Sequence, residues 1–322
     1  MHDLVIRNAQ LVDGSGSAAR PADVAVDGGQ IAAVTGAGEG GPAARAIDAD
    51  GLLLTPGWVD VHTHYDAQAS WDPYLTPSSW HGVTSVVMGN CGVGFAPAAP
   101  DRHEWLIELM EGVEDIPGSA MTEGITWEWE SFEQFLDALD ARHYALDLGA
   151  QVAHGPVRGY VMGDRGAANE AATPEDIEAM SRIVEAGLRA GALGFSTSRT
   201  PLHRSSSGEL VPGTHATADE LFGIADALRR VGHGVFQFAP DHVDVPTTEM
   251  PWMRELARRT GRTVSVNLNQ PDSAPDLWRD VLGLLDEARS DGLDIVAQVA
   301  GRVVGLLMCL EGSFNPLDFH PA

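Results

Sequence analysis

The sequence predicts an α/β fold, with a TIM-like barrel of parallel strands preceded by a small unit made of strands alone. Residues 1–55 carry strand and turn patterns, whereas residues 56–322 alternate between apolar strand-like runs and amphipathic helical segments. From Ala192 onward the expected strands begin at intervals of about 30–40 residues, which is typical of successive βα units. Parallel strands joined by helices in one large domain favour a barrel.

The N-terminal unit is predicted to contain short strands and one clear hairpin. The strands are expected at residues 3–9, 22–26, 30–34, 46–49 and 52–54. Asp27-Gly28-Gly29 separates the second strand from the third and is a hairpin signal. This unit is too small to be the whole fold, so we expect a domain boundary near residue 55.

The barrel domain is predicted to open with a short buried strand at residues 57–61, because this run is apolar. The next six strands are expected at residues 81–88, 146–153, 192–196, 234–238, 263–268 and 294–299. Residues 100–145 form an acidic, tryptophan-containing insertion that is expected to be partly helical. The sequence therefore predicts seven barrel strands.

Two helix N-termini carry strong sequence signals. Thr173 has the position of an N-cap, with Pro174 at the first helical position. Thr217 and Glu220 have the spacing of a capping box. A further helix is expected over residues 275–288.

Residues 303–310 are the candidate for an eighth strand. They follow the seventh strand too closely for a parallel crossover, which takes about a dozen residues. We therefore expect the barrel to be incomplete in these 322 residues, with the C-terminal part of a longer protein missing.

The composition argues against several classes of protein. The net charge is −26, and such a field repels nucleic acid and anionic lipid. No apolar run reaches the about 18 residues of a membrane span, and the N-terminus lacks a signal-peptide pattern. The two cysteines do not suggest a disulfide framework, so the cytoplasm is the expected compartment. All 20 basic residues are arginine, which excludes a lysine Schiff base and a Walker-type phosphate loop.

Metal-binding side chains follow the first two barrel strands. His62 and His64 form a His-x-His pair, and residues so spaced on a strand share one face at a separation of about 6.6–7 Å. Two such imidazoles can bind one zinc ion through bonds of about 2.0–2.1 Å, and the Cys91 thiolate can add a bond of about 2.3 Å. The alternatives are two polar residues that close a strand and an inert, buried cysteine.

Two stretches carry a family resemblance, which extends from Met1 to about Gly194. Residues 56–66, Pro-Gly-Trp-Val-Asp-Val-His-Thr-His-Tyr-Asp, resemble the first barrel strand of the amidohydrolase superfamily. Residues 89–97, Gly-Asn-Cys-Gly-Val-Gly-Phe-Ala-Pro, resemble the N-acyl-D-amino-acid deacylase (D-aminoacylase) branch. The resemblance implies that residues 1–55 are the N-terminal part of a small β-sandwich domain and that residues 56–322 are the barrel.

The resemblance also implies a site with one or two zinc ions. The family pattern is a His-x-His pair, a cysteine on strand two and a histidine at the end of strands five and six. His62, His64 and Cys91 match the first three, whereas Gln237 stands at the strand-five position and strand six ends in amide residues. The family's catalytic aspartate follows strand eight, beyond Ala322, so no catalytic residue is assigned. The sequence has no lysine to bridge two metals as in many amidohydrolases, and Cys91 is the expected substitute.

One strand residue and several loop histidines are candidates for the missing half of the metal site. Gln237 and His242 are candidate metal or polar groups, and His203 and His215 are histidines of the loop after strand four. The alternative for each histidine is an ordinary loop residue.

Three further residues are candidates for substrate binding. Asn90 follows strand two, and His154 ends strand three. Arg199 follows strand four and would hold a substrate carboxylate as a bidentate fork. The alternatives are a buried, hydrogen-bonded His154 and an ordinary salt bridge of Arg199.

The resemblance implies a zinc-dependent hydrolase that deacylates N-acyl-D-amino acids by attack of metal-bound hydroxide on the amide carbonyl. The expected partner is a small molecule, an N-acyl amino acid, with no nucleic acid and no membrane. The sequence leaves open whether the chain forms a homo-oligomer. Two alternatives remain: another amidohydrolase activity on a cyclic amide or hydantoin, and a catalytically inactive truncated fragment or pseudoenzyme.

Overall fold

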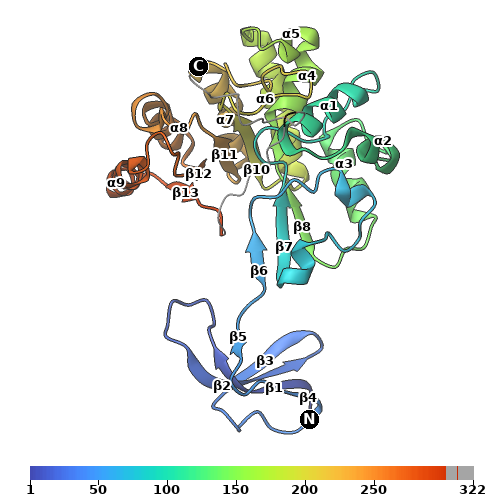
Figure 1. Ribbon diagram of the computed structural model, residues 1–322, viewed down its shortest axis with the longest axis vertical. Helices are drawn as coiled ribbons and strands as arrows, with labels where there is room; N and C mark the ends of the chain where they lie inside the picture. The colour runs from blue at the N-terminus through green and yellow to red at the C-terminus, as the bar shows by residue number, and fades with distance from the viewer. Residues whose placement is uncertain (302–309, 311–322) are drawn as a thin grey trace. The chain divides into compact units, whose positions relative to one another are not determined.

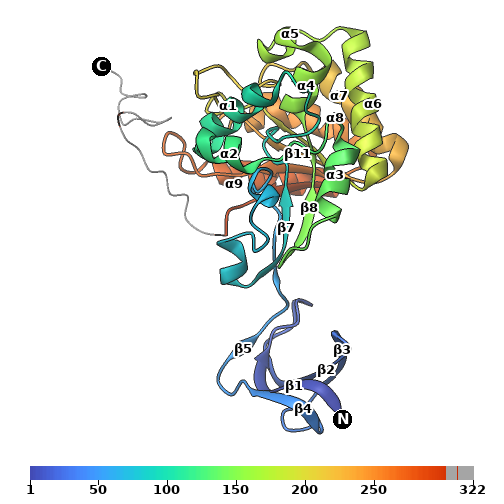
Figure 2. The same ribbon diagram turned by 90° about the vertical axis from the view of Figure 1, so that its right-hand side faces the viewer.

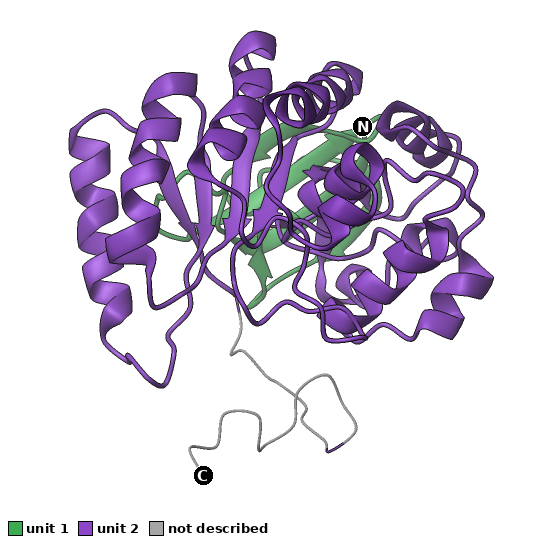
Figure 3. Ribbon diagram, turned by 90° about the horizontal axis from the view of Figure 1, so that it is seen from above, with its two compact units in different colours: residues 1–58 green, residues 59–322 purple. Residues whose placement is uncertain are grey.

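The computed structural model describes residues 1–301 and 310. The chain divides into two compact units, Met1–Trp58 and Val59–Ala322, which Figure 3 distinguishes by colour. The candidate eighth strand, at residues 303–310, lies outside the described residues except for Leu310.

The first unit is a five-stranded sheet in the order β3-β2-β1-β4, with β5 paired to β1 (Figure 1). Its strands are β1 (His2–Leu11), β2 (Arg20–Asp27), β3 (Gln30–Thr35), β4 (Ala43–Asp48) and β5 (Leu53–Leu54). The predicted hairpin is confirmed: Asp27 pairs with Gln30, and Gly28 and Gly29 take φ angles of 57° and 79° between them. Two successive residues at positive φ are what a tight two-residue hairpin needs, and glycine adopts them without steric cost.

The second unit contains two sheets. The first has the order β6-β7-β8, and the second, whose neighbouring strands pair in parallel, has the order β13-β12-β11-β10-β9. The strands are β6 (Trp58–Asp60), β7 (Val83–Met88), β8 (Asp147–Ala150), β9 (Val152–Ala153), β10 (Gly194–Ser198), β11 (Val235–Ala239), β12 (Val264–Asn267) and β13 (Ile295–Gln298). The predicted α/β class with parallel strands is confirmed.

The predicted single strand at residues 146–153 is in fact two strands. Only Gln151 separates β8 from β9, yet β8 pairs with β7 whereas β9 pairs with β10. The prediction of one strand was wrong because an apolar run shows only that the chain is extended. It does not show that the chain passes from one sheet to another.

Helices connect the strands of the second unit. They are α1 (His103–Glu114), α2 (Gly118–Gly124), α3 (Phe132–Asp140), α4 (His154–Met162), α5 (Asp164–Ala167), α6 (Pro174–Ala190), α7 (Ala218–Val231), α8 (Met250–Thr260) and α9 (Leu277–Ser290), with short helical turns η1 (Gln68–Ser70), η2 (Ser78–His81) and η3 (Val245–Glu249). Figure 2 shows α6, α7 and α8 gathered beside the second sheet, and each packs on the next. The acidic insertion is partly helical, as predicted, because it contains α1, α2 and α3. Within the part of the chain that the structure describes, no helix has both the length and the hydropathy to cross a membrane.

The two helix starts differ from each other. At α6 the capping box is complete, because Thr173 and Asp176 exchange hydrogen bonds of 3.2 and 2.9 Å. At α7 the Thr217 hydroxyl accepts the bond from the Glu220 N–H, but the Glu220 side chain does not return to the N-cap. The predicted capping box at Thr217 is therefore only half formed, because the Glu220 carboxylate binds other side chains inside the unit.

The first barrel strand was predicted to be buried, and this prediction was wrong for its apolar side chains. Trp58 is 59% exposed, Val59 61% and Val61 46%. Strand β6 is an edge strand among the described residues, because β7 is its only neighbour in the sheet. An apolar sequence does not by itself show that a strand has a second neighbouring strand to help cover its side chains.

Candidate metal centre

The ends of strands β6 and β7 bring three candidate metal ligands together. His62 and His64 follow β6, and Cys91 follows β7. One ligand atom from each lies within 4.8 Å of the other two, and His62 Nε2 is 3.1 Å from Cys91 Sγ. This is the only such group of histidine, cysteine and carboxylate side chains within residues 1–301 and 310.

Glycines allow the loop after β7 to carry Cys91 to this position. Gly89 and Gly92 have φ angles of +75° and +72°, and a Cβ on Gly89 would lie 2.2 Å from the carbonyl oxygen of Gln151. Cys91 itself has a φ of +55°, an unfavourable conformation for a residue with a Cβ. The backbone therefore accepts local strain of about 1–3 kcal/mol to present the thiol beside His62.

Gln298, the last residue of β13, orients His62. Its Oε1 lies 2.8 Å from Nδ1 of His62. A carbonyl oxygen can only accept, so Nδ1 carries the proton and the lone pair of Nε2 faces Cys91. Metal-binding histidines in proteins have this arrangement, with the second ring nitrogen held by an acceptor.

Gln237 stands where the family resemblance implies a histidine. Its side chain forms a hydrogen bond to the backbone of Cys91. Its Oε1 accepts the N–H of Cys91 at 3.1 Å, and its Nε2 donates to Oδ1 of Asn267 at 3.0 Å. Asn267 in turn points its Nδ2 at the Cys91 sulfur, 3.8 Å away. The Gln237 side chain is completely buried, and both ends of its amide are used in these contacts.

His64 lies beside a carboxyl group that the sequence patterns did not reveal. Its Nε2 is 3.2 Å from Oε1 of Glu114, the last residue of α1. Its other ring nitrogen, Nδ1, is buried and has no hydrogen-bond partner among the described residues. Glu114 is one of many acids in the insertion, and no spacing in the sequence connects it with His64.

Burial disfavours the charged forms of the groups in this cluster. It lowers the pKa of His64 well below its ordinary value and raises the pKa of Cys91 well above it. It also raises the pKa of Glu114 to about 8 and that of Asp66, whose carboxylate accepts the N–H of Gly89, to about 7. A cation bound here would favour the ionised thiol and carboxyl groups, because metal binding displaces protons from its ligands.

The candidate loop histidines separate into two groups. His203 bonds to Ser198 through Nδ1 at 2.9 Å, and burial together with the nearby His242 and His62 lowers its pKa to about 4. His242 contacts the amide of Asn269 at 3.2 Å. His215 is exposed. His203 and His242 are thus half-buried, and His203 lies near enough to His62 and His242 for their charges to affect its pKa.

Two of the three candidate substrate-binding residues have their polar atoms bonded internally. Asn90 is completely buried, with Nδ2 bonded to the carbonyl oxygen of Val87 at 2.9 Å and Oδ1 accepting from Gln151 at 2.9 Å. His154 is also completely buried, and its two ring nitrogens contact Thr197 at 2.8 Å and Glu220 at 3.0 Å. His154 is therefore the buried, hydrogen-bonded histidine of the alternative interpretation.

Arg199 forms an internal salt bridge. Its Nε lies 3.0 and 2.9 Å from the two carboxylate oxygens of Glu249, and Nη1 donates to the carbonyl oxygen of Ala216 at 2.7 Å. This arrangement corresponds to the alternative of an ordinary salt bridge, and it uses much of the guanidinium that a substrate carboxylate would need.

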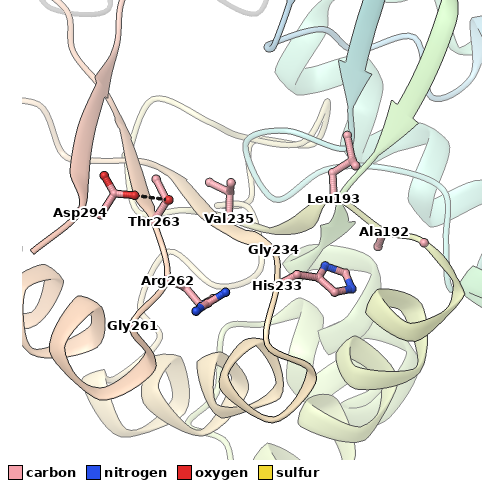
Figure 4. A pocket seen from close by; sticks show the side chains of 10 residues that line it. Ala192, Leu193, His233, Gly234, Val235, Gly261, Arg262, Thr263 and Asp294 are labelled. Carbon is pink, nitrogen blue, oxygen red and sulfur yellow. Dashed lines mark hydrogen bonds between the residues drawn. The ribbon is translucent and has the colours of Figure 1, made fainter.

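A separate pocket of about 560 Å³ lies at the opposite ends of the second sheet's strands (Figure 4). Its lining comes from the residues that precede or begin β10, β11, β12 and β13, including His233, Arg262 and Asp294. Thr263 and Asp294 hydrogen-bond to each other within it. The candidate metal ligands follow the carboxyl ends of their strands, where active sites of parallel α/β folds lie, so this pocket is not part of the candidate centre.

Comparison with known proteins gives a consistent set of relatives. The amidohydrolase family model matches residues 45–308. D-aminoacylase of Alcaligenes xylosoxydans xylosoxydans is 34% identical over 211 residues, which are 65% of this chain and 40% of the relative. N-acyl-D-glutamate deacylase of the same organism is 30% identical over 301 residues, or 92% of this chain and 56% of the relative. The chain thus spans about half the length of these curated relatives.

Solved structures of such proteins have the same fold. A D-aminoacylase structure that concerns its binuclear metal centre has a TM-score of 0.77 at 27% identity, covering 94% of this chain and 59% of the other. N-acyl-D-glutamate deacylase from Bordetella bronchiseptica, complexed with zinc and a phosphonate inhibitor, has a TM-score of 0.74 at 27% identity, with the same coverage.

Proposed function

Because the chain belongs to the amidohydrolase family, as its motifs predicted, we propose that it is a metal-dependent hydrolase that removes the acyl group from N-acyl-D-amino acids. The observation that carries the proposal is the convergence of His62, His64 and Cys91 at the ends of β6 and β7. The relatives named as deacylases of N-acyl-D-aspartate and N-acyl-D-glutamate support the substrate class. The proposed substrate is therefore a small molecule with an amide bond next to a carboxylate.

Zinc, as one or two ions, is the metal we propose. Two imidazoles and a thiolate suit zinc, with bonds of about 2.0–2.1 Å to nitrogen and about 2.3 Å to sulfur. The residues present fit such an ion, because Nδ1 of His64 is buried without a partner among residues 1–301 and 310, and Nε2 of His62 faces the Cys91 sulfur. Gln237, bonded at both ends, is a supporting residue in this proposal, while His203 and His242 remain candidates for a second ion.

The chain's own residues prepare the site for amide hydrolysis. A bound zinc ion supplies a Lewis acid that polarises the amide carbonyl and activates water. Gln298 holds the proton on Nδ1 of His62, so that Nε2 is available as a ligand. Gln237 fixes the backbone of Cys91, whose thiol would bind a metal as the thiolate. Cys91 is buried, and His62 and His64 are half-buried.

We also propose that the two sheets of the second unit belong to one (β/α)8 barrel with an incomplete wall. The single residue Gln151 links β8 to β9, so one continuous stretch of chain contributes to both sheets. The bond between His62 and Gln298 shows that the ends of β6 and β13 lie close together. These two strands have a free edge within the described residues, and one further strand between them would close the barrel. The first unit is proposed to be part of a β-sandwich domain.

The test combines metal analysis with a substrate panel. The purified chain is expected to contain zinc and to release amino acid from N-acetyl-D-aspartate or N-acetyl-D-glutamate faster than from the L-enantiomers. Cys91→Ala and the double variant His62→Ala/His64→Ala should lose both metal and activity, whereas His81→Ala, at an exposed histidine, should keep both. Hydrolysis of a hydantoin or cyclic amide instead of the acylated amino acids would replace the proposed substrate class. A zinc-free wild-type chain without activity would favour an inactive fragment.

A further inference from the structure

Cys91 occupies an unusual position in a tight turn. The N–H of Val93 bonds to the carbonyl oxygen of Asn90 at 3.1 Å and closes a turn over residues 90–93, which we call the cysteine turn. Its two central residues, Cys91 and Gly92, have φ angles of +55° and +72°. Turns with positive φ at both central positions strongly favour glycine, asparagine and aspartate there. Cysteine is not one of these residues, so contacts from outside the turn are needed to hold its conformation.

Side chains of the second sheet supply such contacts to both central residues. The N–H of Cys91 donates to Oε1 of Gln237 at 3.1 Å, and the N–H of Gly92 donates to the hydroxyl oxygen of Ser196 at 3.0 Å. Ser196 and Gln237 lie opposite each other on the paired strands β10 and β11. Their side chains therefore leave the sheet on the same face, toward the cysteine turn.

Ser196 also holds the residue that precedes the turn. Its hydroxyl donates to the carbonyl oxygen of Gly89, so one side chain connects both ends of the segment that contains Cys91. A hydroxyl has a single proton, and here that proton is committed to Gly89. Ser196, Gly89 and Gly92 are all buried, so loss of the hydroxyl would leave a buried carbonyl and a buried N–H without this partner.

The cysteine turn also lies directly against the backbone of β10. A Cβ on Gly92 would come 3.0 Å from the backbone nitrogen of Ser198 and from Cα of Thr197. The carbonyl oxygen of Gly92 accepts the N–H of Gly155, in the first turn of α4, at 2.8 Å. This close packing brings the backbone of the turn within reach of the short Ser196 side chain.

We infer that Ser196 is a positioning residue of the candidate metal centre, which fixes the cysteine turn and thereby holds the Cys91 thiol beside His62. The inference rests on the proposed function and adds to it a residue that contributes no ligand atom. Groups that orient a metal ligand typically change metal affinity by about 10–100-fold when they are removed. Ser196 acts through the backbone of the turn, because its hydrogen bonds go to Gly89 and Gly92 and not to the thiol.

The test measures zinc affinity by competition with a chelator in the wild-type chain, Ser196→Ala and Ser181→Ala. Ser196→Ala is expected to bind zinc about 10–100-fold more weakly. Ser181 is a matched control in α6, since it is also buried and its hydroxyl also donates one hydrogen bond, to Gly223, and accepts one, from Arg230. Ser181→Ala should bind zinc as the wild type does.

A second pair of variants separates the hydroxyl from the space that the side chain fills. Threonine and valine have nearly the same shape, but only threonine has a hydroxyl. Any steric cost in this buried position is therefore common to Ser196→Thr and Ser196→Val. Ser196→Thr is expected to bind zinc more tightly than Ser196→Val.

Two further readouts distinguish positioning from a general loss of stability. In the cobalt-loaded chain, the charge-transfer absorption of a thiolate bound to cobalt should weaken or shift in Ser196→Ala and stay unchanged in Ser181→Ala. In the metal-free chain, amide hydrogen exchange of a peptide that contains residues 90–93 should be faster in Ser196→Ala than in the wild type, because the N–H of Gly92 loses its acceptor. Ser181→Ala should leave this exchange unchanged.

The outcomes distinguish this inference from the proposed function. Equal zinc affinity in the wild type and Ser196→Ala would overturn the role of Ser196 and leave the metal site in place. An equal loss of affinity in Ser181→Ala, or equal affinities of Ser196→Thr and Ser196→Val, would also overturn it. A wild-type chain that binds no zinc would overturn the proposed metal site. Unchanged hydrogen exchange in metal-free Ser196→Ala would overturn the hold of Ser196 on the cysteine turn, whether or not zinc binds.

Discussion

His62 and Gln298 are joined by a hydrogen bond of 2.8 Å although 236 residues separate them in the sequence. The bond connects the residue that follows β6 with the last residue of β13. It fixes the ring of His62 in the orientation that turns Nε2 toward Cys91. The candidate metal centre therefore depends on a strand that contributes no ligand to it.

Replacing Gln298 with alanine is expected to weaken zinc binding by about 10–100-fold, because His62 loses the acceptor that fixes its proton on Nδ1. Chelator competition measures the change. Gln270→Ala is the control, since the Gln270 side chain is exposed and bonds only to the carbonyl oxygen of Pro275. Unchanged affinity in Gln298→Ala would show that the His62 ring is held by packing alone.

Gly89→Ala is expected to destabilise the chain by at least ~1–3 kcal/mol. The glycine has a φ of +75°, and its new Cβ would lie 2.2 Å from the backbone oxygen of Gln151. Urea unfolding measures the effect. The matched control is Gly283→Ala in α9, where nothing lies within 4 Å of the added Cβ and removal of a helical glycine should stabilise the chain by up to ~1 kcal/mol. A neutral Gly89→Ala would mean that the loop can move away from Gln151.

Glu220→Gln is expected to be strongly destabilising, by about 3–5 kcal/mol. The Glu220 carboxylate is 1% exposed and binds both His154 and Arg158, so the variant leaves the buried Arg158 guanidinium without its counter-charge. Denaturant unfolding provides the measurement. Glu178→Gln breaks an exposed ion pair with Arg182 and should change stability by only ~0.5 kcal/mol or less. Similar effects of both substitutions would contradict the importance of the buried pair.

Acid is expected to destabilise the chain partly through His154. Burial lowers the pKa of this histidine in the folded state, although Glu220 opposes the shift and Arg158 and Arg199 reinforce it. The unfolded state then binds the extra proton below about pH 6.5, so stability falls as the pH decreases from 6.5 toward the folded pKa.

The slope due to one such proton is at most ~1.4 kcal/mol per pH unit. Unfolding midpoints of His154→Gln between about pH 5 and 7 should therefore depend less on pH than those of the wild type. His81→Gln, at an exposed histidine, should keep the wild-type slope. An unchanged slope in His154→Gln would show that His154 titrates alike in both states.

Local patterns predicted the elements whose causes are local. The hairpin at Gly28–Gly29 and the capped start of α6 at Thr173 depend on neighbouring residues, and both are present. The strand expected at residues 234–238 is β11 (Val235–Ala239), displaced by one residue. The periodicity of apolar residues and the identity of turn residues are enough to predict such features, because the interactions that form them span only a few positions.

The features that the sequence did not reveal depend on distant residues. Glu220 has the spacing of a capping box, but a buried histidine and arginine from α4 bind its carboxylate instead. Glu114, the last residue of α1, lies beside His64 although 50 residues separate them in the sequence. The His-x-His pair and Cys91 were predicted to meet because parallel strands end at one edge, and Gln237 was singled out on strand five. No pattern in the sequence indicated that Gln298 would contact His62.

The long sequence separation of His62 and Gln298 has a consequence for protein synthesis. A ribosome that adds about 5–20 residues per second needs roughly 10–50 s to proceed from one to the other. During that interval Cys91 has left the ribosome, but the neighbouring His62 does not yet have its hydrogen-bond partner Gln298. An unprotected thiol in a nascent chain is open to oxidation and to capture of the wrong metal. If the proposed centre binds a metal, the metal supply and the redox state of the cell during translation should therefore affect how much of the expressed protein carries an intact centre.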